Sequence, residues 1–202
     1  MTISHSIRFQ PCGFDYHRHW PKLVTEADLL ILAAEVFHDV TVAGPSGIAV
    51  PEISKAGIGF NGRADSLQDR QPLLLPPPEQ VPDRNGLDLA LHLRVRTDGK
   101  PYDLLVKAVL LRMRHHLSDT CVIGSSRSWR HWAQAHHLAA SVFGGHRQLG
   151  RSQLGDTTAG LVLVGRRWTD PRPARHPDGA GTPLMQLAAG HDRRTQPLQD
   201  RT

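Results

Sequence analysis

The sequence has few cysteines, few aromatic residues and no long apolar run. Its two cysteines, Cys12 and Cys121, are too few and too far apart for a disulfide framework or a zinc knuckle. The longest apolar run, "LLILAA", is far short of the roughly 18 residues that a membrane span requires. The opening stretch "MTISHSIRFQPCG" lacks the apolar segment of a secretory signal. We therefore expect a cytoplasmic protein that does not enter a membrane.

Aromatic residues make up 5% and hydrophobic residues 39% of the 202 residues, which is low for a chain packed along its whole length. Beyond Arg167 the sequence is rich in Pro, Gly, Arg and Asp and has no apolar periodicity. We predict one domain over about residues 5–165, followed by a disordered tail at residues 169–202.

Glutamate does not occur after Glu79, and charge is unevenly distributed along the chain. Residues 1–93 carry seven Lys or Arg against eleven Asp or Glu, whereas residues 94–150 carry nine against three. A basic segment of this kind favours a polyanionic or phosphorylated partner. Twenty of the 24 basic residues are arginine, however, and that bias is also typical of genomic base composition.

The first half of the chain contains one predicted helix followed by loop signals. Thr25 is a suitable cap for a helix over residues 26–38, which is apolar nearly all round from Leu29 to Phe37 and is therefore expected to be buried. Glycines and prolines then punctuate residues 44–86, with short β-like pieces such as "GIAV" and "GIGF". The prolines of "PLLLPPPEQVP" exclude a helix, and we interpret residues 61–86 as a long, partly ordered loop.

The clearest pattern is a β-α-β-α unit at about residues 87–143. In "LDLALHLRVR" apolar residues alternate strictly with polar or small ones, which predicts a strand with one buried face. A turn at "TDGK", a helix over residues 101–117, the short strand "CVIG" and a helix over residues 128–143 follow. The two strands should be parallel, and "TAGLVLVG" adds a last strand. We predict an α+β fold with a small mixed sheet.

The loop after "CVIG" is a candidate anion site. Ligands of open α/β units bind outside the carboxyl ends of strands, where free amides at a helix N-terminus attract anions. The candidate ligand-binding residues are Asp98, Lys100, Gly124, Ser125, Ser126, Arg127 and Ser128. The alternative is that "GSSRS" is only a turn and a helix cap.

Histidines suggest a metal site of the HD phosphohydrolase type. His17, His19, His38 and Asp39 could supply ligands, with His115 and His116 completing the set. The 13 histidines make such pairs expected by chance, and "VTVAGPSGIAVPE" after Asp39 is turn and strand rather than helix. We therefore expect no metal and no cofactor.

The basic residues and the serines of this region suggest two further kinds of chemistry. Lys107, Arg112, Arg114, Arg127 and Arg130 could contact nucleic-acid phosphates, with Trp129 or Trp132 stacking on bases. The alternative is a solvated helix face with both tryptophans in the core. Nucleophilic catalysis has little support, because no Gly-x-Ser-x-Gly elbow occurs and the serines of "GSSRS" have no identifiable His-Asp partners.

From Gly59 to Gly144 the succession "GFNG", "KPYDLLV", "HH", "SS", "W" and "VFGG" resembles a family of small, uncharacterised bacterial and phage α/β proteins. The resemblance implies an α/β domain and a mobile-element origin, and it implies no activity. Where that family has an acidic residue and a glycine after the serines, this chain has Arg127 and Ser128.

The sequence favours a non-enzymatic cytoplasmic binding or accessory protein that holds a phosphate or other anion at the strand-end edge. A metal-dependent phosphohydrolase and a nucleic-acid-binding protein using residues 94–150 are the alternatives. The partner is then a phosphate-bearing ligand, a nucleic acid or another protein.

Overall fold

The computed structural model describes residues 2–78, 90–117, 120–144, 154–157 and 160–163. Its helices are α1 (Phe14–His38), α2 (Asp103–His116) and α3 (Ala133–Phe143), and a 3-10 turn, η2 (Trp129–Trp132), precedes α3. Its strands are β1 (Ser4–Phe9), β2 (Val42–Ala43), β3 (Glu52–Ser54), β4 (Gly57–Gly62), β5 (Leu73–Leu75), β6 (Leu91–Arg96), β7 (Val122–Ser125), β8 (Leu154–Thr157) and β9 (Gly160–Leu163).

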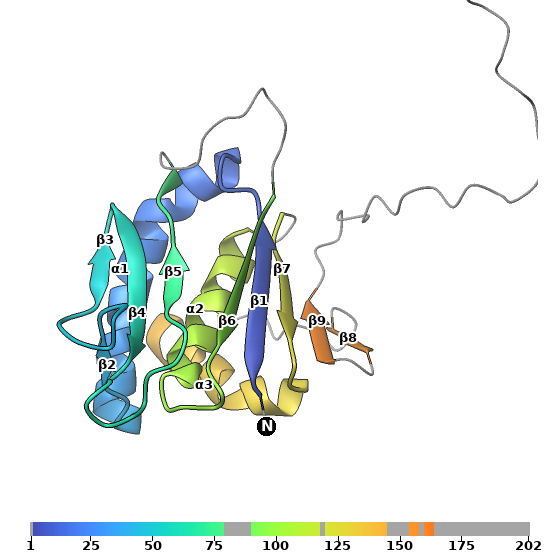
Figure 1. Cartoon of the computed structure of the whole chain (residues 1–202). Helices are drawn as coiled ribbons and strands as arrows, with labels where there is room; N and C mark the ends of the chain where they lie inside the picture. Colours follow the sequence, from blue (N-terminus) through green and yellow to red (C-terminus); the bar gives the residue numbers. More distant parts are fainter. Residues whose placement is uncertain (1, 79–89, 118–119, 145–153, 158–159, 164–202) are drawn as a thin grey trace, which may run out of the picture. The chain divides into compact units, whose positions relative to one another are not determined.

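The strands form two antiparallel sheets, and the helices lie on one side of them (Figure 1). One sheet has the order β6-β1-β7-β9-β8, and the other has the order β2-β4-β3 with β5 also paired to β4. Gln71 links them, because its amide donates to the Arg96 carbonyl at 3.1 Å and its side-chain oxygen accepts from the Arg96 amide at 2.9 Å. The predicted α+β class is confirmed.

The pairing within the large sheet differs from the prediction. β6 and β7 run in the same direction, as expected, but they are not neighbours, since β1 lies between them and pairs antiparallel with both. A mixed sheet with a parallel pair was therefore wrong for the described strands. The segment "SHSIRF" was not predicted as a strand, although Ile7 and Phe9 alternate with polar residues and are buried.

α1 begins eleven positions before the predicted cap at Thr25, so that cap was wrong. Thr25 lies inside the helix, and its hydroxyl donates to the Pro21 carbonyl at 3.2 Å. Pro21 also lies inside α1, where it removes one backbone donor.

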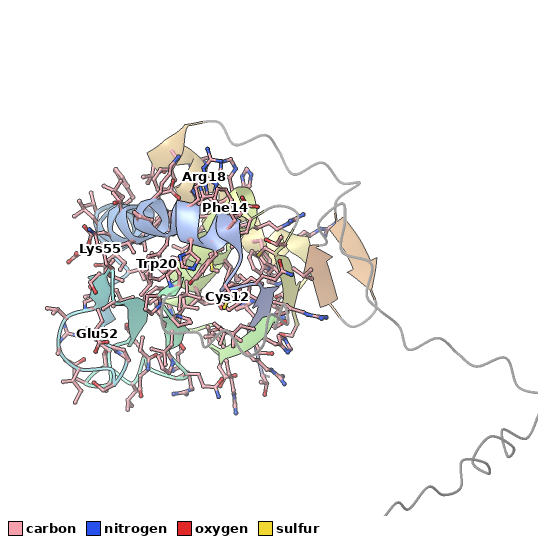
Figure 2. All side chains as sticks on the ribbon, turned by 90° about the horizontal axis from the view of Figure 1, so that it is seen from above. Cys12, Phe14, Arg18, Trp20, Glu52 and Lys55 are labelled. Atoms are coloured by element: carbon pink, nitrogen blue, oxygen red, sulfur yellow. The ribbon has the colours of Figure 1, made fainter. Side chains whose placement is uncertain are left out.

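The apolar stretch of α1 is only half buried, which corrects the prediction of a helix buried all round. Its inner side includes Leu30 and Ala34, both 0% exposed, whereas Val36 is 65% and Phe37 69% exposed. Figure 2 shows Trp20 on the side of α1 that faces the second sheet, where its indole Nε1 donates to the Lys55 carbonyl at 3.0 Å.

The other predicted elements agree with the structure in the second half of the chain better than in the region between α1 and β6. α2, and η2 together with α3, begin and end within a few residues of the predicted helices, and the predicted strands "CVIG" and "TAGLVLVG" correspond to β7 and β9. β5 lies within the predicted loop at 61–86, whereas "GIAV" forms a turn in which Ala49 has φ 58°. Residues 87–89 and the tail at 169–202 lie outside the described residues. None of the described helices is long and apolar enough to cross a membrane.

Candidate functional site

The C-terminal ends of β6 and β7 flank the N-terminal end of β1. We call this end of the sheet the strand-end edge, and most of the predicted site lies there. The Ile3 amide donates to Asp98 Oδ1 at 3.2 Å on one side of β1. On the other side the Ser4 amide donates to Ser126 Oγ at 3.1 Å, and the Ser126 amide donates to the Ser4 carbonyl at 3.0 Å. The predicted residues therefore converge on one edge, but the start of β1 separates the two groups.

Most polar groups of the candidate anion site are hydrogen-bonded to other residues of the protein. The Arg127 amide donates to Ser125 Oγ at 3.1 Å, and Lys100 Nζ donates to the Leu67 carbonyl at 2.8 Å. Ser128 Oγ lies 3.2 Å from His131 Nδ1 and makes no capping bond to the backbone of η2. An anion at this edge would have to displace these bonds or use the arginine side chains.

Asp98 is held by two arginines. Arg96 Nε lies 3.0 Å from both carboxylate oxygens of Asp98, and Arg70 Nε lies 3.4 Å from Oδ2. The hydrogen bond from Arg96 lowers the pKa of Asp98. Asp98 also turns the chain after β6, with φ 51° ahead of Gly99 at φ 72°. Asp98 therefore holds the turn after β6 and orients Arg96, and its carboxylate is already paired with arginine.

Beneath this edge runs a buried chain of hydrogen bonds that starts at Ser125. Ser125 Oγ lies 2.9 Å from His5 Nδ1, and His5 Nε2 lies 2.7 Å from Asp103 Oδ1. Since a carboxylate only accepts, Nε2 carries the proton and Nδ1 is left to accept from the serine hydroxyl. Ser125 Oγ already accepts from the Arg127 amide, which is consistent with its hydroxyl donating to His5.

Asp103, the first residue of α2, is the charged centre of this network. Its Oδ2 is paired with Lys107 one helical turn later, and its Oδ1 also accepts from the Thr97 hydroxyl. Burial by itself would raise the pKa of Asp103, but the hydrogen bond from His5 and the charge of Lys107 lower it to about 2. The carboxylate is therefore ionised at neutral pH.

A second buried network joins α1 and α2. Arg112 binds Glu26 with two bonds, Nε to Oε2 at 2.7 Å and Nη2 to Oε1 at 2.6 Å, and His116 Nε2 lies 2.9 Å from Oε2. The guanidinium of Arg112 also lies over the ring of Phe143, 4.4 Å from its centroid. Burial would raise the pKa of Glu26, but hydrogen bonds from His116 and Arg112 lower it to about 2.

This burial corrects the predicted nucleic-acid surface on the helices. Lys107 is 7%, Arg112 4% and Arg114 6% exposed, and Trp132 is 0% exposed. Lys107 and Arg112 neutralise buried carboxylates and are not available to phosphates. Of the predicted basic set, Arg130 is exposed and Arg127 is half-buried.

The exposed basic residues of the sheet lie on the side away from the helices. We call this side the open face, and β6, β1 and β7 contribute to it the residues His92, Arg94, Arg96, Ser4, Ser6, Arg8, Val122 and Gly124. Arg94 Nη2 donates to Ser4 Oγ at 3.2 Å, which confirms that neighbouring strands share this face. None of these eight positions is acidic.

The histidines of the HD-type hypothesis are spread along one helix. His19 and His38 are 19 positions apart in α1, which at 1.5 Å per residue is roughly 28 Å. Ligands of one zinc ion lie near 2 Å from it, so His17, His19, His38 and Asp39 cannot share a metal. His19 stacks instead on His116, with 4.9 Å between ring centroids. In the part of the chain that the structure describes, no group of three metal-ligating side chains is placed to hold an ion.

Comparisons with known proteins add no assignment: no family model, no curated protein and no solved structure matches the chain. The resemblance to small bacterial and phage proteins stays a prediction.

Sequence reasoning missed His5 and Asp103. They lie 120 and 22 positions from Ser125, so no local motif connects them. The available signal was the alternation of "SHSIRF", which would have identified β1 and placed His5 on its buried side.

Proposed function

We propose that the protein is a binding protein for a ligand that carries several phosphates, and that it holds this ligand on the open face of the five-stranded sheet. The observation that carries the proposal is the row of exposed basic side chains His92, Arg94 and Arg96 along β6. Alternate residues of a strand are about 7 Å apart on one face. Such a row matches a chain of repeated phosphates better than a single one.

The neighbouring strands support this use of the face. Arg8 adds a further positive side chain on β1, and the positions around it carry the hydroxyls of Ser4 and Ser6. On β7 the corresponding position is Gly124, where a Cβ would lie 2.6 Å from Ser6 Oγ. Because Gly124 has no side chain, there is room for the Ser6 hydroxyl, and no side chain projects from this position at the centre of the open face.

The predicted edge residues lie at one end of this face. Ser126 contacts Ser4, and Asp98 orients Arg96, so both help to position the last groups of the row. The row carries no Phe, Tyr or Trp side chain for stacking on bases, and binding would therefore depend mainly on phosphate charge and not on base sequence. The phosphate backbone of a nucleic acid is one source of such a ligand.

The first test measures binding of a fluorescein-labelled oligodeoxythymidylate by fluorescence anisotropy. The double variant Arg94→Gln/Arg96→Gln should bind at least tenfold more weakly, and its salt slope should fall by about 1.4, since each single-strand phosphate contact contributes roughly 0.7. Arg63→Gln is the matched control, because Arg63 is 48% exposed and paired with Asp65 two residues later, as Arg96 (53% exposed) is with Asp98. Unchanged binding of the double variant, or equal weakening in the control, would contradict the proposal.

A second test separates the open face from the strand-end edge. Thermal unfolding is measured with increasing sulfate or inorganic phosphate, where occupancy at 100 times the dissociation constant adds about 2.7 kcal/mol. If the edge binds a single anion, Arg127→Ala abolishes the protection and Arg94→Gln does not. Loss of protection in Arg94→Gln supports the open face.

A further inference from the structure

We propose that Ser125 is an activated nucleophile, with His5 as its general base and Asp103 as the positioning residue, and that the substrate class is a carboxylic ester or thioester. The site faces the helices, on the other side of β7 from Gly124 and the open face. The proposal goes beyond phosphate binding and does not depend on it. It also departs from the sequence-based expectation of a protein without catalytic function.

The geometry supplies the three contacts that serine activation requires. A base must lie within hydrogen-bond reach of the hydroxyl, and a third group must orient the base. Ser125 Oγ is 2.9 Å from His5 Nδ1, and His5 Nε2 is 2.7 Å from Asp103 Oδ1. The two ring nitrogens have exchanged places relative to the serine-protease triad, in which Nε2 faces the serine. Either nitrogen can accept the proton when the other donates to a carboxylate.

The surroundings of His5 hold its ring in one orientation. The His5 side chain is 0% exposed, and Trp132 packs against it edge-on, with 5.2 Å between ring centroids and 86° between ring planes. Asp103 cannot turn away, because Lys107 and Thr97 bind its oxygens. Ser125, by contrast, is only half-buried at the end of β7 and is more exposed than His5, Asp103, Thr97 and Lys107.

A purely structural role explains this arrangement less well. A buried ion pair such as Asp103 and Lys107 contributes little net stability compared with apolar residues of similar volume. A neutral histidine could also bridge β1 and α2 through a backbone carbonyl, without a buried charge. The ionised carboxylate has a use once the imidazole must accept a proton, because it stabilises the imidazolium that forms.

Arg127 supplies a donor for the charge that develops on the substrate. Its Nε is buried, and within the described residues it has no hydrogen-bond partner. Its backbone amide donates to Ser125 Oγ, so the backbone of Arg127 lies beside the nucleophile. A cationic donor near the attacked carbonyl stabilises the oxyanion of the tetrahedral intermediate.

The reaction balances with water as the only co-reactant. Ser125 Oγ adds to the carbonyl carbon of the ester or thioester while its proton passes to His5 Nδ1. The C–O bond to the alcohol, or the C–S bond to the thiol of a thioester, then breaks as His5 returns that proton to the leaving oxygen or sulfur. Water then adds to the acyl-Ser125 carbonyl and gives its proton to His5. The acid leaves, and Ser125 Oγ regains its proton.

The test is covalent labelling of the full-length protein with a fluorophosphonate, in which the Ser125 oxygen displaces fluoride from phosphorus. Peptide mass spectrometry should locate the adduct on Ser125. Ser125→Ala should abolish labelling, and Ser54→Ala, a control at an exposed serine of β3 outside both proposed sites, should keep a rate within about twofold of the wild type. Absence of an adduct on the folded wild type, or equal labelling of exposed serines such as Ser66, would overturn the proposal.

A second variant distinguishes activation from packing. Asp103→Asn should lower the labelling rate of the folded protein at least tenfold, because a neutral amide no longer stabilises the imidazolium. Circular dichroism establishes that the variant is folded, and if it is not, Thr97→Val, which removes only one bond to Asp103, takes its place with a smaller loss expected. An unchanged rate in a folded Asp103→Asn protein would show that the network is structural. Oligonucleotide binding by Ser125→Ala should be unchanged, so the two proposals fail separately.

Discussion

At the scale of single residues, the buried carboxylates govern how stability depends on pH. Glu26 has an ordinary pKa of 4.5 when the chain is unfolded and about 2 when it is bound to Arg112 and His116. A group whose pKa is lower in the folded state stabilises above its unfolded pKa and loses that contribution as pH falls. The contribution of Glu26 is therefore complete at neutral pH and disappears between about pH 4.5 and pH 2.

We expect Glu26→Gln to destabilise the protein by about 3 kcal/mol at pH 7, because Arg112 is left buried without its carboxylate. The variant should also lose less stability than the wild type between pH 5 and pH 3. Urea unfolding at a series of pH values measures both effects. Asp28→Asn, an exposed position on the same helix, is the control, and an equal change in that variant would contradict the assignment.

The two cysteines should differ sharply in reactivity. The thiol of Cys121 is 0% exposed, and burial raises its pKa to about 12, whereas Cys12 is exposed. An aromatic disulfide reagent at pH 8 should modify Cys12 at once and Cys121 only after denaturant is added. Rapid modification of both thiols in the native protein would show that Cys121 is not in the core.

At the scale of elements, β6 shows how alternation fixes which residues meet the core. Val95 is 4% exposed and points toward the helices, whereas His92 lies on the open face. Val95→Asp should unfold the protein or destabilise it by several kcal/mol, because it buries an unpaired charge. His92→Asp should change stability by less than about 1 kcal/mol. Similar melting temperatures for the two variants would mean that the register is wrong.

The same strand shows what could be predicted from the sequence and what could not. The strict alternation of "LHLRVR" and the helical patterns of residues 101–117 and 128–143 are local features of the sequence, so these elements were predicted. β1 was missed because its alternation covers only six residues and is followed closely by Pro11 and Gly13, which are loop signals. Its insertion between β6 and β7 is a long-range pairing, and no local pattern specifies which strand completes a sheet.

α1 and the candidate site differ from the prediction for a related reason. Glu35 is the one polar residue of the apolar stretch of α1, so periodicity could not distinguish the buried Leu30 from the exposed Val36. The arginines of α2 looked like a surface because their partner Glu26 lies 86 positions away. Ser125 and Asp98 were predicted at a common edge, but His5, which joins the edge to α2, depends entirely on β1.

At the scale of the whole molecule, we expect the tail at residues 169–202 to contribute nothing to thermal stability. Residues 169–202 have no periodic apolar face in the sequence, and residues 1–168 form a compact unit by themselves. Deleting the tail should leave the melting temperature of the protein within about 2 °C of the full-length value, since the sequence of the tail offers no periodic apolar face to bury. A fall of several degrees in differential scanning calorimetry would show that the tail packs against the domain.

The central claim is that a phosphate-bearing ligand binds the open face, and amide chemical-shift mapping tests it most directly. Labelled full-length protein is titrated with a short oligodeoxythymidylate at low salt, and each backbone resonance reports its own surroundings. We expect the largest shifts on β6, β1 and β7, at Arg94, Arg96, Ser6 and Arg8, with smaller ones at the Ser126 edge. Shifts confined to the helices, or no shift at concentrations that saturate a basic control protein, would contradict the claim.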